Sequence, residues 1–309
     1  MRILVTGGAG FIGSHIVDKL LQNDYKVIIV DNLSSGSLEN LPCNSNLKFY
    51  QKDILTDDLS EIFETEKPDF CIHLAAQTSV IKSIENPIND AELNITGTIK
   101  LIEHCKKYNI KKFVTASSAA VYGQPQYLPV DETHQTKPIS YYGLSKLTME
   151  NYVKLSCIPY LIFRFANVYG PRQASSKESG VISIFNDYMI KSEPINIYGN
   201  GEQIRDFVYV EDIAEICTLA IKNDKFINQT LNISTNKGVS INELFNLMKN
   251  LYKYPLNATH LPTRVGDIKD SILSNTNLIT LTPNYQFTDI NNGVKKLREY
   301  YLKVGGVNA

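Results

Sequence analysis

The sequence predicts an α/β fold, a doubly wound parallel sheet with a smaller mixed α/β lobe, and two observations support this. Short apolar runs alternate with longer amphipathic stretches through the first two-thirds of the 309 residues, which is the pattern of a parallel sheet with helices on both faces. The apolar runs are rich in Ile, Val, Leu and Phe and show little polar alternation, as expected for strands that are covered on both sides.

The elements of this sheet are expected in a fixed order along the chain. The expected strands are 3–6, 26–30 (ending at Asp31), 47–50, 70–74, 112–116 and 161–165, and the expected helices are 11–22, 89–108 and 141–155. Beyond residue 167, glycines and prolines break the pattern before a helix at 208–221 and a strand at 231–234. Residues 1–167 and 206–235 should therefore form the sheet domain, and 168–205 and 236–309 the smaller, substrate-binding lobe.

Composition and charge exclude several classes of protein. The chain is 43% hydrophobic and 20% charged, an ordinary globular balance, and its formal net charge is −1. Nucleic acids and anionic membrane surfaces require a basic excess, and no apolar stretch is long enough to span a bilayer. The five cysteines are widely spaced and odd in number, which fits neither a disulfide framework nor a metal site. We expect a cytoplasmic protein with no metal, nucleic-acid or membrane partner.

A glycine-rich turn follows the first expected strand and opens the first expected helix. Gly7, Gly10 and Gly13 leave the backbone bare, so that a pyrophosphate could approach the N–H groups at the start of the helix. Asp31 ends the second strand 18 residues beyond Gly13, where a carboxylate would bond the ribose hydroxyls and repel a 2′-phosphate. The joint pattern predicts a Rossmann-type domain that binds NAD rather than NADP.

The ends of two other strands belong to the same prediction. Asp53 follows the third strand and could reach the adenine edge, although a plain helix N-cap explains it nearly as well. Leu74, Ala75 and Ala76 end the fourth strand, and their mostly small side chains would leave room for a ligand at the point where the strand order reverses.

Tyr142 and Lys146 lie four residues apart on an expected helix and therefore share one face. A phenol with its ordinary pKa of about 10 is a poor base, but a nearby ammonium and an oxidised nicotinamide both favour the phenolate. The pair could then take a proton from a sugar hydroxyl as hydride leaves for NAD. The alternative is a surface packing pair. Ser117 and Ser118 end the preceding strand, and alternation does not decide which hydroxyl would help.

At this point the chain resembles the extended short-chain dehydrogenase/reductase family, specifically its sugar-nucleotide epimerases and dehydratases. The resemblance runs nearly end to end and is carried by 7–13, 31–33, 73–77, 94–98, 117–123, 142–146, 164–171, 205–207 and 264–267. It implies Ser118, Tyr142 and Lys146 as catalytic residues, and a structural role for His73.

The resemblance also implies two sets of binding residues. The NAD-binding set is Gly7, Gly10, Phe11, Ile12, Gly13, Asp31, Asn32, Asp53, Ile54, Leu74, Ala75, Ala76, Asn94, Tyr142 and Lys146. The substrate-binding set is Ser118, Asn167, Tyr198, Arg205, Phe207, Arg264, Asp267 and Ser271. In the second set two arginines would hold a diphosphate, because a guanidinium fork matches phosphate oxygens.

The choice of reaction follows from the two residues after Ser118. The 4,6-dehydratases of the family carry Asp and Glu where Ala119 and Ala120 stand, and UDP-glucuronate decarboxylases usually carry Glu at the second position. The resemblance therefore implies NAD-dependent 4-epimerisation of a UDP-hexose through a transient 4-keto sugar, with Tyr142 taking the O4 proton. Ser271 occupies a position where a bulky residue would exclude N-acetyl sugars, so these should be accepted beside UDP-glucose and UDP-galactose.

Other functions remain as alternatives. A UDP-glucuronate 4-epimerase or another nucleotide-sugar oxidoreductase would share this fold, but an NADP-linked reductase usually has a basic residue near Asp31, and 31–40 contains none. A non-catalytic NAD sensor would typically have lost Tyr142 or Lys146, so this class is disfavoured. The resemblance also implies a homodimer, formed through the helices 89–108 and 141–155.

Overall fold

The computed structural model describes residues 1–174, 180–263 and 268–304. The chain divides into two compact units. Unit 1 comprises Met1–Gly123, His134–Phe165 and Ile213–Leu231, and unit 2 comprises Gln124–Thr133, Ala166–Asp212 and Asn232–Ala309. The boundaries differ from those expected from the sequence at four places, because 124–133, 166–167, 206–212 and 232–235 fall in unit 2. The division into an NAD-binding and a substrate-binding domain stays a prediction.

Unit 1 is built on a seven-stranded sheet in the order β10-β6-β5-β4-β1-β2-β3. Its five pairings from β3 to β6 are all parallel, so the predicted Rossmann-type α/β fold is confirmed. The strands are β1 (Arg2–Thr6), β2 (Lys26–Asp31), β3 (Leu47–Gln51), β4 (Phe70–His73), β5 (Lys112–Ser118), β6 (Tyr160–Phe165) and β10 (Gln229–Ile233).

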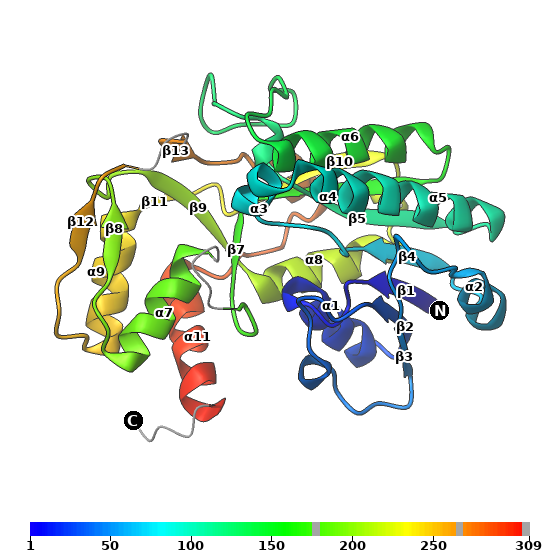
Figure 1. Cartoon of the computed structure of the whole chain (residues 1–309), viewed down its shortest axis with the longest axis horizontal. Coiled ribbons are helices and arrows are strands. Elements are labelled where there is room, and N and C mark those ends of the chain that lie inside the picture. Colours follow the sequence, from blue (N-terminus) through cyan, green and yellow to red (C-terminus); the bar gives the residue numbers. More distant parts are fainter. Residues whose placement is uncertain (175–179, 264–267, 305–309) are drawn as a thin grey trace. The chain divides into compact units, whose positions relative to one another are not determined.

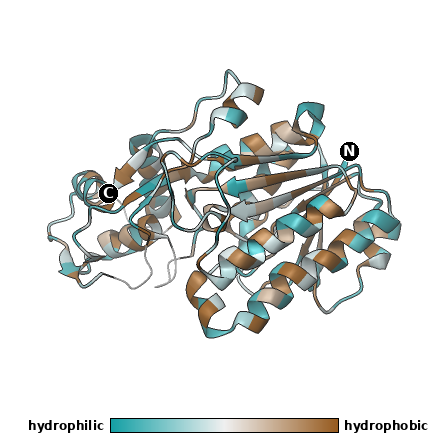
Figure 2. Cartoon of the chain, turned by 90° about the horizontal axis from the view of Figure 1, so that it is seen from above, coloured by the Kyte–Doolittle hydropathy of each residue, from teal (hydrophilic) through white to brown (hydrophobic). Residues whose placement is uncertain are grey.

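Helices cover both faces of this sheet. Figure 1 shows α5 (Thr98–Lys107) and α6 (Tyr141–Leu155) on one face and α1 (Phe11–Gln22) and α8 (Val210–Lys222) on the other. The shorter helices are α2 (Ser60–Glu66), α3 (Val80–Glu85) and α4 (Pro87–Ala91). The helices alternate hydrophobic and hydrophilic bands (Figure 2), and their buried bands pack on the strands, as Leu101 of α5 and Val153 of α6 do.

The start of α6 and the end of α8 have clear local causes. The Ser140 hydroxyl caps α6 by accepting a bond from the Gly143 N–H at 3.1 Å. Lys112 of β5 is only 2% exposed, and its ammonium donates to the carbonyls of Ala220, Ile221 and Asn223, each at 3.0 Å. All three ammonium protons are thereby bonded, and the carbonyls at the C-terminal end of α8 receive a cation.

Two sequence expectations are corrected by the structure. The single helix expected over 89–108 is α4, a π-helical segment (Glu92–Gly97) and α5. The helix expected to begin at Val208 begins at Val210, because Val208 and Tyr209 pair with Val168 and Tyr169 as strand residues. Helices α2 and α3 of unit 1 had no counterpart in the expectation.

Unit 2 centres on β9 (Ile204–Tyr209). This strand pairs in parallel with β7 (Asn167–Tyr169) and β13 (Asp270–Ser271), and antiparallel with β11 (Gly238–Ser240), which makes the lobe mixed α/β as predicted. The remaining elements are β8 (Asn196–Tyr198), β12 (Thr259–Leu261), α7 (Val181–Lys191), α9 (Ile241–Tyr252), α10 (Thr276–Leu281) and α11 (Ile290–Val304). In the part of the chain that the structure describes, no helix has the length and apolar character to cross a membrane.

Candidate active site

The glycine turn of unit 1 tolerates no side chain at two of its positions. A Cβ on Gly13 would lie 2.1 Å from the Gly7 carbonyl oxygen, and one on Gly7 would lie 2.6 Å from the Ala75 nitrogen. Gly7 also has a φ of +71°, which favours glycine. Helix α1 begins directly after Gly10 with no side-chain cap and no acidic residue in its first turn. The N-terminus of α1 thus offers free N–H groups and positive potential, which fits a pyrophosphate.

Asp31 connects the end of β2 to this turn. Its two carboxylate oxygens accept bonds from the Ala9 N–H at 2.9 Å and the Leu33 N–H at 2.8 Å. The carboxylate is 7% exposed, and each oxygen keeps acceptor capacity for a ribose hydroxyl. This arrangement fits the adenosine half of NAD.

Asp53 lies beside Asn32. The Asn32 side-chain amide donates to Asp53 Oδ2 at 2.8 Å, while Asp53 Oδ1 accepts from the Leu55 N–H at 2.7 Å. Asp53 therefore closes a turn rather than capping a helix, since the next helix, α2, begins at Ser60. The neighbouring Ile54 is buried and faces Gly97, where a Cβ would come within 3.0 Å of it.

The His73 side chain is hydrogen-bonded between the end of β1 and the start of α5. Thr98 donates its hydroxyl to the Asn94 carbonyl at 2.7 Å, so it accepts from His73 Nε2 at 2.9 Å. The Nδ1 atom must then accept from the Thr6 hydroxyl at 2.7 Å. Burial, with a smaller contribution from Lys146, lowers the pKa of His73 to about 3. The ring stays neutral near pH 7, which agrees with a structural role.

Asn94 lies in the π-helical segment and is 1% exposed. Its side chain forms a reciprocal pair with the backbone of Gln77, accepting at 2.9 Å and donating at 3.0 Å, and it also donates to the Ser145 hydroxyl at 3.0 Å. The buried carboxylate of Asp90 accepts from the Gln77 amide at 2.7 Å. The π-helical turn thus fixes the segment after β4 against α6, next to Lys146.

Ser118, Tyr142 and Lys146 come together where β5 ends and α6 begins. Ser118 hydrogen-bonds Tyr142, which lowers the pKa of Tyr142, but burial raises it more strongly. The Lys146 ammonium donates to the Ala116 carbonyl at 3.1 Å, and burial lowers its pKa to about 8 against the opposing charges of Asp90 and Glu150. The raised pKa of Tyr142 shows that the chain alone does not generate a phenolate at pH 7; a nicotinamide charge would act in the needed direction.

The structure separates the two serines that the sequence left equivalent. Ser117 is 3% exposed and donates its hydroxyl to Glu150 Oε1 at 2.6 Å. Ser118 is half-buried, and its oxygen accepts from the Ala120 N–H at 3.2 Å. Only the Ser118 hydroxyl lies with Tyr142, as the resemblance implied.

The residues predicted to bind substrate lie in unit 2, apart from Ser118. Ser271 of β13 pairs with Arg205 of β9, and Asn167 of β7 pairs with Phe207 of β9. Arg205 Nη1 donates to the carbonyls of Ile204 at 2.9 Å and Lys269 at 3.0 Å. In parallel strands directly paired residues point to the same face, so these four positions share one face of the small sheet.

Two members of this set differ in exposure. Phe207 is 5% exposed and packs edge-on against Tyr169, with ring centroids 6.4 Å apart, so it belongs to the core of unit 2. Tyr198 is 36% exposed. Arg264 and Asp267 lie outside the described residues.

Among the residues that are described, no group of three His, Cys, Asp or Glu side chains could hold a metal ion.

The sequence reading missed a buried ion pair behind this group, formed by Glu150 and Arg164. The signal was available, because Glu150 follows Lys146 by four residues and Tyr142 by eight, on the same face of the helix.

Fold and site together define an NAD-binding α/β enzyme with a serine–tyrosine–lysine group. Residues 3–234 match the model of the NAD dependent epimerase/dehydratase family, and the chain belongs to this family. The glycine cradle, the N-terminus of α1 and Asp31 fit the cofactor that the family uses.

Within this family, the chain is similar to several proteins named as 4-epimerases of UDP-sugars. The chain is 48% identical to a putative UDP-glucose 4-epimerase of Methanocaldococcus jannaschii, over 86% of this chain and 87% of that protein. It is similar to the structure of UDP-glucose 4-epimerase from Thermotoga maritima with UDP-glucose, with 41% identity, a TM-score of 0.94 and coverage of 98% and 99%. It is also similar to UDP-N-acetylglucosamine 4-epimerase from Methanobrevibacter ruminantium in complex with UDP-N-acetylmuramic acid, with 36% identity, a TM-score of 0.92 and coverage of 98% of both chains.

Proposed function

We propose that this protein is an NAD-dependent 4-epimerase of UDP-hexoses. The observation that carries the proposal is the grouping of Ser118, Tyr142 and Lys146 at the end of β5, with Ala119 and Ala120 following directly in a 3₁₀ turn. The group supplies proton transfer at one oxygen, and the two methyl side chains supply no acid for elimination at C5 and C6. Epimerisation at C4 requires the proton transfer but no elimination.

The residues of the chain then have distinct tasks. Tyr142 accepts the proton of the sugar O4 and later returns it, Ser118 hydrogen-bonds the same oxygen, and Lys146 supplies positive charge beside the tyrosine. Bound NAD would take up hydride from C4 and give it back to the opposite face. Arg205 would bind the diphosphate, together with Arg264.

We include N-acetylated sugars in the proposed substrate range. Ser271 is half-buried and pairs with Arg205 on β13, so its small side chain leaves volume next to a residue proposed to hold the diphosphate. A Ser271→Tyr variant should lose turnover of UDP-N-acetylglucosamine and retain turnover of UDP-glucose. Equal losses on both sugars would contradict this part of the proposal alone.

The test of the main proposal is proton NMR of the purified protein with UDP-glucose and then UDP-N-acetylglucosamine, with no added cofactor. Appearance of the galacto anomeric signal is the expected result, and denatured enzyme should release NAD. No new signal from either sugar, in protein that contains NAD, would overturn the proposal and favour a uronate substrate or a reductase.

We further propose that the protein is a homodimer formed through α6 and its neighbours α3 and α4. One face of α6 exposes Tyr141 (52%), Leu144 (51%), Tyr152 (44%) and Leu155 (79%), and Ile84 and Ile88 are 61% and 70% exposed. Exposed apolar stripes of this kind support association with a second copy. Light scattering should give twice the chain mass, and Leu144→Glu with Leu155→Glu should give the monomer; a monomeric wild type would refute this.

Five free cysteines support a reducing, cytoplasmic location.

A further inference from the structure

A carboxylate and a guanidinium lie buried together directly behind the proton-transfer group. The side chains of Glu150 (α6) and Arg164 (β6) are 0% and 5% exposed. Arg164 donates twice to the carboxylate, from Nε to Oε1 at 2.9 Å and from Nη2 to Oε2 at 2.7 Å. Buried ion pairs are often no more stabilising than apolar residues of the same volume, so stability alone does not account for this pair.

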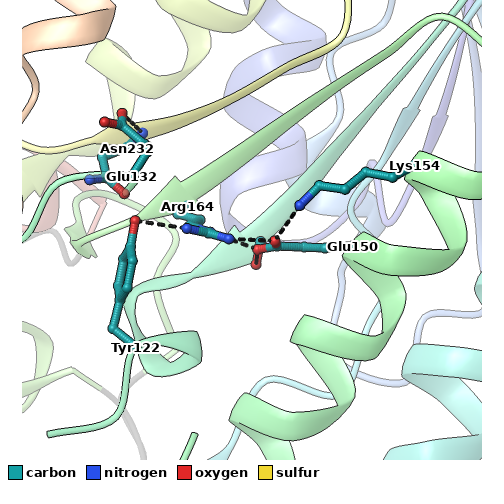
Figure 3. Close-up of polar contacts among 7 residues, drawn as sticks. Tyr122, Glu132, Glu150, Lys154, Arg164 and Asn232 are labelled. Atoms are coloured by element: carbon teal, nitrogen blue, oxygen red, sulfur yellow. Dashed lines mark hydrogen bonds and ion pairs between the residues drawn. The ribbon is translucent and has the colours of Figure 1, made fainter. Parts of the chain in front are cut away.

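The pair reaches the chain on both sides of Ser118. On one side, the Ser117 hydroxyl donates to Glu150 Oε1 at 2.6 Å. On the other side, Arg164 Nη1 donates to the Tyr122 hydroxyl at 2.9 Å, and the guanidinium carbon lies 4.8 Å from the centre of the Tyr122 ring. Figure 3 shows Arg164 extended between Tyr122 and Glu150. The turn that holds the Ser118 hydroxyl is therefore fixed at both of its ends.

The same pair joins β5 to the face of α6 that carries the tyrosine and the lysine. Three consecutive residues of β5 each bond one residue of this face: Ala116 bonds Lys146, Ser117 bonds Glu150, and Ser118 bonds Tyr142. The three helix residues are spaced by one turn each, so Glu150 is the last of three successive contacts that this face of α6 makes with the end of β5.

Glu150 also acts on Lys146 through its charge. Asp90 of α4, His73 of β4 and Glu150 of its own helix interact electrostatically with Lys146. Tyr142 precedes Lys146 by one helical turn. Because His73 is neutral near pH 7, Asp90 and Glu150 are the two charges that oppose the effect of burial on the Lys146 pKa. Removal of one of them should release the ammonium proton at lower pH.

We propose that Glu150 and Arg164 are positioning residues for the epimerase reaction: they hold Ser118 in register with Tyr142 and Lys146, and Glu150 supports the charged form of the lysine. This inference rests on the proposed function. It concerns residues that touch neither sugar nor NAD, since each of their polar atoms described above is bonded within the protein.

The test is Glu150→Gln in the NAD-containing enzyme, with UDP-glucose as substrate. We expect kcat to fall by about 10- to 100-fold, as for lost general acid–base geometry, with KM within about twofold of the wild type because no substrate contact is lost. The alkaline limb of the kcat profile should move to lower pH. Ser117→Ala, which removes one hydrogen bond and no charge, should lower kcat less and leave that limb in place.

The matched control is Glu66→Gln. Glu66 is another buried carboxylate of unit 1, bonded by Lys48 at 2.7 Å and Tyr50 at 2.6 Å, and it belongs to α2. This variant should lose thermal stability while its kcat, KM and pH profile remain those of the wild type. The control therefore separates positioning from general stabilisation.

Three outcomes would overturn the inference. An unchanged kcat and pH limb in Glu150→Gln would do so, as would a loss of kcat fully matched by loss of folded protein or of NAD. If Glu150→Gln does not fold, a wild-type kcat in Ser117→Ala decides against it. Absence of turnover by the wild type would remove the proposed function and this inference together, whereas wild-type turnover with unaffected variants would remove only the inference.

Discussion

Replacement of His73 by glutamine should change how the stability of the protein depends on pH. In the folded chain His73 is neutral, because its Nε2–H donates to Thr98 and its Nδ1 accepts from Thr6. Protonation would place a second N–H against the Thr6 hydroxyl, which already accepts weak bonds from the Leu74 and Ala75 N–H groups, both at 3.3 Å. The folded state therefore resists a proton that the unfolded chain takes up readily.

The size of this effect follows from the two pKa values of His73. The value is about 3 in the folded protein against an ordinary value of 6.5 in the unfolded chain. The stability contribution is complete above pH 6.5 and is lost as the pH falls from 6.5 towards 3, because the unfolded state binds the extra proton in that window. Each pH unit is worth about 1.4 kcal/mol, so about 2 kcal/mol should be lost between pH 6.5 and pH 5.

The measurement is urea unfolding of wild type and His73→Gln at pH values from 8 to 5, with the NAD content checked at each pH. Glutamine does not titrate, so the difference in unfolding free energy between the two proteins should be constant from pH 8 to 7 and should shift by about 2 kcal/mol, against the wild type, by pH 5. Parallel curves over the whole range would refute both the neutral state and the hydrogen-bond assignment.

Three further predictions follow from single contacts. Tyr142→Phe should lower kcat by about 10²- to 10⁴-fold with NAD retained, measured by NMR turnover, whereas Tyr141→Phe, at a 52% exposed neighbour, should not. Gly13→Ala should deplete NAD, measured by release on denaturation, because its Cβ would lie 2.1 Å from the Gly7 oxygen; Gly10→Ala, with 3.3 Å to the same atom, should deplete it less, and equal depletion would count against the argument. Lys112→Met should cost about 3 kcal/mol in urea unfolding, since three carbonyls lose their donor. Lys111→Met, which loses a surface pair with Asp69, should cost under about 1 kcal/mol. Similar losses of unfolding free energy in both variants would contradict the stabilising role of the three carbonyl bonds to Lys112.

The sequence predicts a helix correctly where the residues that start and stabilise the helix lie in the same segment. The helix expected over 141–155 is observed with the same bounds because a serine cap and an apolar stripe lie within it. The helix expected over 89–108 is different, since its π-helical middle depends on Asn94 bonding the distant Gln77 backbone. No periodicity within the segment records that partner.

The sequence by itself determined the sheet, the glycine turn and the order of the residues that would bind NAD, because these follow from periodicity, from the absence of side chains and from spacing along one chain. Strand alternation left two adjacent serines equivalent and the family resemblance implied Ser118; only the tertiary structure gives the physical reason, because Glu150 of another element accepts the Ser117 hydroxyl. It also decided that His73 is neutral and that Lys146 has a pKa of about 8, because burial and neighbouring charge are properties of packing rather than of sequence.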